Sequence, residues 1–162
     1  MVEPMISLAA SIGQNKGLRG LTLRARLAGV QVLFLGLDLY EKGECRLFAP
    51  FEACYRLGDG EIEVAVDVRN GKVFRLIAGP GYQGLLCGKI GVGMSAGESM
   101  RREPSLRYDE SEEAIVYDDC PGVLLDLPEV DPLPEAVPAL AISAISVYAP
   151  EAFSPASQRG YL

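Results

Sequence analysis

The amino-acid sequence repeats itself at an interval of about seventy residues. Two pairs of segments match: Gly20–Leu27 with Lys89–Ala96, and Val73–Pro80 with Ser143–Pro150. Because the two matches have nearly the same offset, they predict two copies of one unit. The first copy spans residues 1–80 and includes an N-terminal segment. The second spans residues 81–162 and carries an added proline-rich loop and a C-terminal tail.

The first copy contains the clearest hairpin pattern of the chain. Polar and apolar residues alternate from Glu61 to Val68, and Asn70-Gly71 then precedes a second apolar run, 73–77. This pattern predicts two strands joined by a two-residue type I′ turn. Four residues are expected to face the core: Ile62, Val64, Val66 and Val68. Four are expected to face outward: Glu61, Glu63, Ala65 and Asp67.

Weaker patterns precede this hairpin. We expect a helix that starts near Leu27, a strand over residues 30–39, and one or two strands over residues 45–57 that are interrupted at Pro50. The N-terminal residues 1–16 have mixed character, with a short helical turn expected over 6–10. Each of these assignments rests on a short apolar run.

The second copy predicts one helix followed by strands. Ser95 has the pattern of a helix N-cap with Glu98 three residues later, and Pro104 is expected to help end the helix near Glu103. Strands are expected over residues 106–109, 114–117, 123–127 and 142–148. Together the copies predict an α+β fold of two tandem repeats, each a short helix with antiparallel strands, which share or pack one sheet core.

Composition limits the functions open to this chain. Apolar residues make up 49% and charged residues 23%, which is typical of a globular protein. Histidine is absent, so Ser-His-Asp and Cys-His catalysis and most zinc hydrolase designs are excluded. The four cysteines lack the spacing of a metal site, and we expect reduced thiols, with a Cys45–Cys54 disulfide as the alternative. We therefore expect no cofactor, no metal and no catalytic residues.

No apolar run is long enough to span a bilayer, and no basic segment precedes an apolar stretch at the N-terminus. These features favour a cytoplasmic protein that does not contact membranes.

The charged residues are unevenly distributed between the two copies. Residues 1–80 hold ten Lys or Arg and nine Asp or Glu, whereas residues 81–162 hold five and thirteen. This asymmetry argues against nucleic-acid binding and favours either simple solubility or a basic partner.

The acidic residues of the second copy are densest around one predicted hairpin. We take eight of its residues as the candidate partner-binding set: Tyr108, Asp109, Glu110, Glu112, Glu113, Tyr117, Asp118 and Asp119. The spacing does not fit a calcium loop, and nothing places two carboxylates for glycoside hydrolysis. Tyrosine rings can anchor a partner while carboxylates meet its Lys or Arg side chains. A solvated hairpin tip that protects an edge strand is an equal alternative.

The proline-rich loop, 128–138, continues this acidic character. Its neighbourhood contributes Asp126, Glu129, Asp131 and Glu135. Fixed proline angles lower the entropic cost of ordering a loop on binding, which suits recognition. They suit a rigid surface connection equally well.

A family resemblance is carried by Gly91–Met100, by the Leu-Arg-Tyr-Asp-Glu segment and by the terminal Ile-Ser-Ala-Ile-Ser-Val-Tyr. The Gly-Met-Ser start of the helix followed by antiparallel strands resembles small bacterial immunity proteins of polymorphic-toxin loci. It is also similar to the helix-then-sheet repeats of β-lactamase-inhibitor-like and outer-membrane-assembly lipoprotein domains. The second copy, about 88–150, matches best, whereas the first has Arg24-Ala25 where the second has Gly93-Met94. The resemblance implies a protein-binding or inhibitory role and no catalytic residues.

These observations favour a non-enzymatic protein that neutralises a cognate bacterial toxin through an acidic face. One alternative is a small-ligand-binding protein or a carboxylate-dependent enzyme with its site between the repeats. A buried carboxylate with a raised pKa in a pocket between the copies would favour that alternative. A third alternative is a homo-oligomer built through exposed edge strands.

Overall fold

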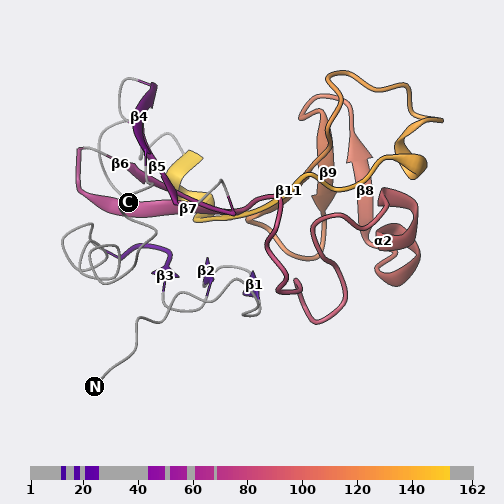
Figure 1. Cartoon of the computed structure of the whole chain (residues 1–162), viewed down its shortest axis with the longest axis horizontal. Helices are drawn as coiled ribbons and strands as arrows, with labels where there is room; N and C mark the ends of the chain where they lie inside the picture. The colour runs from indigo at the N-terminus through magenta and orange to yellow at the C-terminus, as the bar shows by residue number, and fades with distance from the viewer. Residues whose placement is uncertain are drawn as a thin grey trace.

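The computed structural model describes residues 12–13, 17–18, 21–25, 44–49, 52–57, 61–67 and 69–153. These residues form one large antiparallel sheet, a small three-stranded sheet and a short α-helix, which confirms mixed α+β character. Among them, no α-helix combines the length and the apolar character that crossing a membrane requires. Figure 1 shows the large sheet running the length of the molecule, with α2 at one end.

The large sheet has eight strands among the described residues. They are β4 (Glu44–Ala49), β5 (Glu52–Leu57), β6 (Ile62–Asp67), β7 (Lys72–Ala78), β8 (Leu106–Asp109), β9 (Ala114–Tyr117), β10 (Val123–Asp126) and β11 (Ala144–Tyr148). Their spatial order is β4-β5-β6-β7-β11-β10-β9-β8. Each group of four consecutive strands is therefore a meander, and the two meanders meet where β7 pairs with β11.

Most of the predicted strands of the sheet are confirmed. The interruption at Pro50 separates β4 from β5, and the predicted hairpin at 61–77 is β6 and β7. In the second half, β8, β9 and β10 lie where the alternation predicts them, and the predicted strand at 142–148 begins at Ala144. The helix predicted near Leu27, the strand at 30–39 and the turn at 6–10 lie outside the described residues, as does Val68.

The predicted type I′ turn at Asn70-Gly71 is wrong. Gly71 has a positive φ of 71°, but Asn70 does not, and a type I′ turn needs both. Asp67 pairs with Lys72, so the connection between the strands is longer and spans residues 68–71. Its cause is the Asp67 carboxylate, which accepts hydrogen bonds from the Arg69 backbone N–H at 2.9 Å and from its guanidinium at 2.7 Å. These bonds stabilise an Asx-type turn in place of the tighter one.

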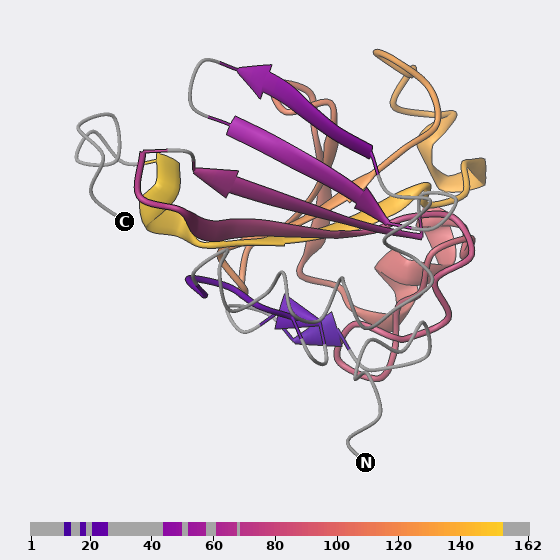
Figure 2. The ribbon, with the colours of Figure 1, turned by 60° about the vertical axis from the view of Figure 1, so that its left-hand side comes forward.

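One face of the sheet packs into the core. The buried strand residues include Val64, Leu76, Ile115, Leu125 and Ile145, each no more than 1% exposed. Segments outside the sheet cover this face and supply further buried side chains: Ile12, Leu21, Leu23, Leu86 and Ile90. Figure 2 shows the short strands β1 (Ile12–Gly13), β2 (Gly17–Leu18) and β3 (Leu21–Thr22) beneath β7 and β11.

The helix α2 (Ala96–Arg102) begins as the sequence predicts. The Ser95 hydroxyl accepts a hydrogen bond from the Glu98 backbone N–H at 3.2 Å. The Glu98 carboxylate does not turn back to Ser95 but pairs with Arg101 and Arg102 along the helix. The helix ends at the C-cap Glu103 and lies against β8 and the 3-10 helix η1 (Val137–Ala139). A second 3-10 helix, η2 (Pro150–Phe153), follows β11.

The two halves share one pair of backbone hydrogen bonds near the start of their last strands, β7 and β11. The Arg24 N–H donates to the Val73 carbonyl at 2.6 Å, and the Val73 N–H donates to the Ala25 carbonyl at 2.8 Å. In the second half, the Gly93 N–H donates to the Ile142 carbonyl and the Ile142 N–H to the Met94 carbonyl, both at 2.8 Å. Each atom pair recurs 69 residues later, and Arg24 and Gly93 both have a positive φ.

Candidate functional site

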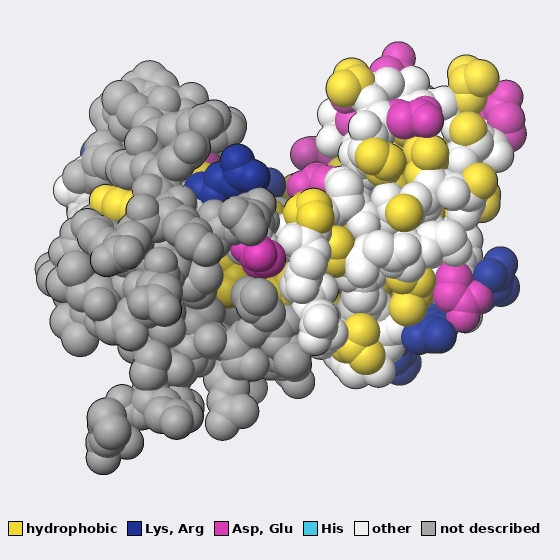
Figure 3. Space-filling model, in the orientation of Figure 1, with side chains coloured by type: hydrophobic (Ala, Val, Ile, Leu, Met, Phe, Trp, Pro, Cys, Tyr) yellow, Lys and Arg dark blue, Asp and Glu magenta, His cyan; other side chains and the backbone are white. Residues whose placement is uncertain are grey.

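The first candidate site is an acidic surface at the far end of the second half, which we call the acidic end. It consists of two segments. One is the β8–β9 turn, residues 110–113, and the other is residues 128–135 of the proline-rich loop, which comes after β10. Figure 3 shows acidic and hydrophobic side chains interleaved at the top of the right-hand part of the molecule. The two segments adjoin, because Glu110, Glu113 and Asp131 all act electrostatically on the Tyr108 hydroxyl.

The β8–β9 turn is organised by Asp109. Its carboxylate accepts hydrogen bonds from the Ser111 hydroxyl and from the Ser111 backbone N–H, the latter at 2.9 Å. The Glu112 N–H at 3.3 Å and the Arg107 guanidinium at 3.1 Å complete the set. Together these bonds lower the pKa of Asp109 to about 2, with the Ser111 hydroxyl as the largest cause. Asp109 therefore shapes the turn and stays ionised.

The carboxylates of the turn itself are exposed. Glu110, Glu112 and Glu113 form no ion pair with any described residue, whereas Arg107 pairs with Asp109 and with Asp118 at 2.8 Å. Glu113 adopts a left-handed conformation with φ of 52°. The turn thus presents three carboxylates to solvent that no described residue pairs with.

The two tyrosines of the candidate set do not stand on that exposed surface. Tyr108 pairs with Ile115, and Tyr117 with Leu106, so both rings lie on the core face. The Tyr108 hydroxyl is buried and has no hydrogen-bond partner among the described residues, and burial raises its pKa. Tyr117 is 8% exposed, and burial also raises its pKa. These rings are packing residues of the sheet.

Asp118 and Asp119 lie at the other end of β9. They begin the β9–β10 turn, whereas Glu110 to Glu113 form the turn before β9. The eight sequence-selected residues therefore lie toward the two ends of β9, although Arg107 bridges Asp109 and Asp118, which line one surface cleft together with Glu112. Tyr108, Asp109, Glu110, Glu112 and Glu113 cluster at one end, and Tyr117, Asp118 and Asp119 lie at the opposite end.

The proline-rich loop adds apolar side chains that the sequence pattern did not single out. Val130 is 85% exposed and Leu133 is 66% exposed, and both exceed the exposure of Leu85, the next large apolar side chain. Their acidic neighbours Glu129, Asp131 and Glu135 are exposed and form no ion pair with a described residue. The sequence did contain a signal for this exposure. Val130 and Leu133 stand in a run of prolines and carboxylates, and no helical or strand periodicity there assigns them to a core.

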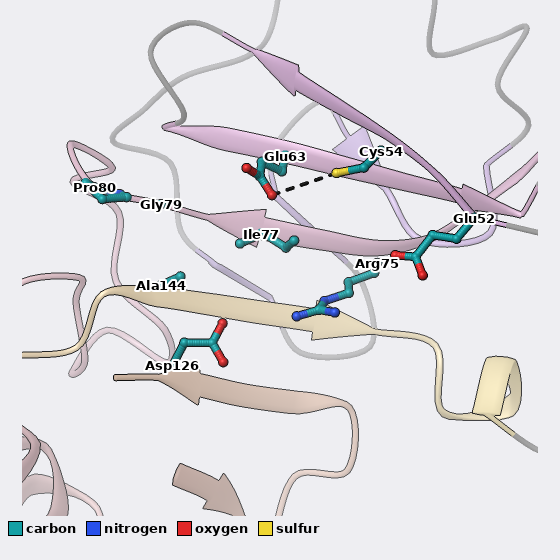
Figure 4. A pocket seen from close by; sticks show the side chains of 9 residues that line it. All are labelled: Glu52, Cys54, Glu63, Arg75, Ile77, Gly79, Pro80, Asp126 and Ala144. Atoms are coloured by element: carbon teal, nitrogen blue, oxygen red, sulfur yellow. Dashed lines mark hydrogen bonds between the residues drawn. The ribbon is translucent and has the colours of Figure 1, made fainter. Parts of the chain in front are cut away.

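The second candidate site lies on the sheet face opposite the core, which we call the outer face. The junction of the halves forms a cleft of about 320 Å³ there, the central cleft. Figure 4 shows its lining: Glu52 and Cys54 from β5, Glu63 from β6, Arg75 and Ile77 from β7, Asp126 from β10, Ala144 from β11, and the following Gly79 and Pro80. Ala65 and Ser146, also on this face, are fully buried, so the face is concave here.

Arg75 lies at the centre of this cleft. Its guanidinium donates to the Ser146 hydroxyl at 3.1 Å, and its buried Nε–H has no partner among the described residues. It forms no ion pair with the surrounding carboxylates of the described chain, although it acts electrostatically on Asp126. Asp126 was singled out from the sequence as part of the acidic loop region, but its side chain points into the cleft (Figure 4).

The ionisable groups of the cleft are shifted by burial. Burial raises the pKa of Asp126, and Arg75 opposes this only in part. Burial and the carboxylates of Glu63 and Glu52 raise the pKa of the Cys54 thiol to about 12. The thiol remains protonated and contacts the Glu63 carboxylate, with 3.8 Å between sulfur and oxygen. The cleft therefore combines a cation that forms no ion pair within the described chain with several carboxylates, and its thiol is unreactive.

Among the described residues, no group of three or more His, Cys, Asp or Glu side chains is arranged to hold a metal ion. Comparisons with known proteins identify no relative: no protein-family model, no curated protein and no solved structure matches this chain.

Proposed function

We propose that this chain is a non-enzymatic protein-binding protein that docks a basic partner on the acidic end. The supporting observation is the exposure of Val130 and Leu133 among carboxylates from two separate loops. Exposed apolar side chains rimmed by polar residues mark protein-interaction sites, and an apolar centre with a polar rim is the usual arrangement of a protein interface. The unpaired carboxylates would attract Lys and Arg side chains of the partner and speed the encounter.

The finer role that we propose is immunity: the chain covers the active surface of a cognate toxin in the cytoplasm. Its support is the resemblance carried by Gly91–Met100 and the strands that follow. We further propose that the halves are tandem copies of one unit, because two hydrogen bonds recur at an offset of 69 residues. In this proposal, the acidic end is formed by segments of the second copy that differ from the corresponding segments of the first.

The experiment begins with co-expression and co-purification of the chain with the product of the adjacent gene. We expect a complex and protection of the cells from that product. Absence of both would contradict the immunity role, while a complex without protection would leave only the protein-binding role.

Variants of the complex then locate the interface. Charge reversal at Glu110, Glu113 and Asp131 to Lys should lower the association rate constant about tenfold at low salt, and the difference should shrink as salt rises. Replacing Val130 and Leu133 by Ser should instead speed dissociation at every salt concentration. Asp119→Lys is the matched control, because this exposed carboxylate lies at the opposite end of β9 and should leave both rates nearly unchanged. Equal effects at Asp119 would contradict docking at the acidic end.

A small-ligand-binding role at the central cleft is the second candidate, and the raised pKa of Asp126 favours it. The cleft lies between the halves, where the alternative from the sequence expects a site. Titration with small organic cations and with carboxylates, followed by thermal denaturation, tests this role. A rise in the thermal midpoint with either the cations or the carboxylates, which disappears in Asp126→Asn, would support ligand binding at the cleft. No rise with either class of compound would count against ligand binding there.

A further inference from the structure

A gap separates two opposite charges in the central cleft. The Arg75 guanidinium donates to the Ser146 hydroxyl on β11 at 3.1 Å, and Asp126 lies directly opposite Ala144, also on β11. Ser146 and Ala144 are two residues apart on one face of the strand, which places them about 7 Å apart. This spacing explains why Arg75 and Asp126 form no ion pair.

Neither charge of this pair is neutralised within the described chain. The buried Nε–H of Arg75 has no hydrogen-bond partner among the described residues. Burial raises the pKa of Asp126, and the attraction to Arg75 opposes that effect only in part. Figure 4 shows the two side chains directed over β11 from opposite sides. An anion beside Arg75 and a cation beside Asp126 would therefore replace hydration that burial has removed.

The length of the gap selects a ligand with two closely spaced charges. A charge-assisted hydrogen bond between nitrogen and oxygen is about 2.8 Å long. In an α-amino acid, the ammonium nitrogen lies about 3 Å from the nearer carboxylate oxygen. Two such bonds with the amino acid between them span up to about 8 Å, so one α-amino acid can bridge Arg75 and Asp126.

The charges around this pair disfavour ligands of a single sign. Glu52 and Glu63 also line the cleft, so their carboxylates would repel a simple anion that binds Arg75. A simple cation beside Asp126 would in turn be repelled by Arg75. Only a ligand that carries both charges is attracted by both sets of groups.

The remaining wall of the cleft is apolar. Ile77, Pro80 and Ala144 form it, and the cleft encloses about 320 Å³. This volume lies at the small end of the range for ligand sites, which suits an amino acid with a short aliphatic side chain.

We propose that the central cleft binds an α-amino acid with a short aliphatic side chain, held by its carboxylate at Arg75 and by its ammonium group at Asp126. The proposal rests on the ligand-binding role given above as the second candidate function, and it names the chemical class of that ligand. It is independent of partner docking at the acidic end. In the bound state, one molecule neutralises both Arg75 and Asp126 without closing the gap across β11.

Isothermal titration calorimetry of the full-length chain with L-valine and two analogues tests the proposal. Isobutylamine has the same skeleton without the carboxylate, and isovalerate has it without the ammonium group. We expect L-valine to bind, and each analogue to bind at least about tenfold more weakly, because each loses one charge-assisted pair. This comparison needs no change in the protein, so it does not depend on the folding of a variant.

Two variants assign the ends of the ligand. Arg75→Gln should weaken the binding of L-valine at least about tenfold but should not weaken that of isobutylamine, which has no carboxylate to lose. Asp126→Asn should weaken the binding of L-valine similarly but should not weaken that of isovalerate. Arg101→Gln is the matched control, because this exposed arginine belongs to α2 and does not line the cleft.

The same titrations contain the results that would overturn the proposal. Binding of isobutylamine or isovalerate as tight as that of L-valine would exclude the zwitterion but retain the ligand-binding role of the cleft. Absence of binding by all three compounds would contradict both. A loss in Arg101→Gln as large as that in Arg75→Gln would place the ligand outside the cleft.

Discussion

The two halves of the large sheet are built alike, but they differ in how their last two strands are connected. In the first half, β6 and β7 are joined by residues 68–71, whereas in the second half β10 and β11 are joined by residues 127–143. Both pairs are antiparallel: Ile62 opposes Ala78 in one half, and Val123 opposes Val147 in the other, although only the β6–β7 pair has a register irregularity, between Ala65 and Val66. The longer connection contains Val130 and Leu133. The shared strands therefore make the sheet, and the unshared connection supplies the acidic end.

The longer connection also contributes to the core. Val137 and Ile142 are 2% and 1% exposed, and Ile142 forms the hydrogen-bond pair with the 93–94 turn. In the first half, that position is taken by Val73, which lies directly in β7. The second half thus has the same contact as the first, with a longer, acidic segment before it. A longer segment can be accommodated here because it precedes the contact that positions β11.

The largest expected effect comes from a position at which the halves differ in their need for glycine. The Tyr148 N–H donates to the Gly122 carbonyl as the Gly79 N–H donates to the Glu61 carbonyl, each at 2.9 Å. Gly122 has φ of 92°, and a Cβ at this position would lie 2.5 Å from the backbone carbonyl oxygen of Tyr148. Gly122→Ala should therefore lower the free energy of unfolding by about 3 kcal/mol or more, measured by urea denaturation.

The equivalent substitution in the first half is the control for this prediction. Glu61 is outside the left-handed region, and Glu61→Ala should cost no more than about 1 kcal/mol. Similar losses at the two positions would show that the turn before β10 is not specifically constrained.

A smaller effect is expected at the turns that begin each half. Gly93 has φ of 93°, and a Cβ at this position would meet nothing within 4 Å, so Gly93→Ala should cost about 1 kcal/mol from backbone strain alone. Arg24 has φ of 68°, and its guanidinium pairs with Glu151, with a second contact at 2.9 Å. Arg24→Gly relieves the strain but removes a half-exposed ion pair, so its net effect should be near zero.

Thermal and urea denaturation of these two variants compares the starting turns directly. A large loss in Arg24→Gly would mean that the Glu151 pair, and not backbone geometry, holds the first turn. A double variant, Arg24→Gly with Glu151→Gln, then measures the contribution of the pair.

The strand positions were predictable from the sequence because their signals are local. Alternation at Glu61–Asp67 and the breaks at Pro50 and Glu110–Glu113 depend on neighbouring residues alone. The type of turn at Asn70-Gly71 was not predictable from that dipeptide, because the Asp67 carboxylate stabilises a longer loop. A side-chain hydrogen bond therefore overrode the usual preference of the turn residues.

The candidate sites depend on distant pairing and were only partly predictable. Charge density identified Glu110, Glu112 and Glu113, but the direction of β9 places Asp118 and Asp119 at its other end. The central cleft needs β7 to pair with β11, and no short-range pattern contains that pairing. Asp126 illustrates the difference, since its carboxylate belongs by sequence to the acidic loop region but by structure to the cleft.

The smallest expected effect is a difference in how the free energy of unfolding depends on pH at the central cleft and at the acidic end. Burial raises the folded-state pKa of Asp126, so this group makes folding less favourable as pH rises through the ordinary Asp value towards the raised one. Hydrogen bonds lower the pKa of Asp109 from 3.8 to about 2, so its contribution is full above 3.8 and is lost as pH falls towards 2.

Asp126→Asn should therefore be more stable than the parent chain at pH 7 and lose that advantage in acid, because the parent carboxyl is then neutral as well. Asp109→Asn should be less stable than the parent at pH 7, with the difference shrinking in acid. Urea denaturation of the three proteins from pH 7 down to pH 3 measures both slopes. Parallel curves would mean that neither carboxyl changes its pKa on folding. A stability loss in Asp126→Asn at pH 7 would mean that its attraction to Arg75 outweighs its burial, which would weaken the case for a ligand at the central cleft.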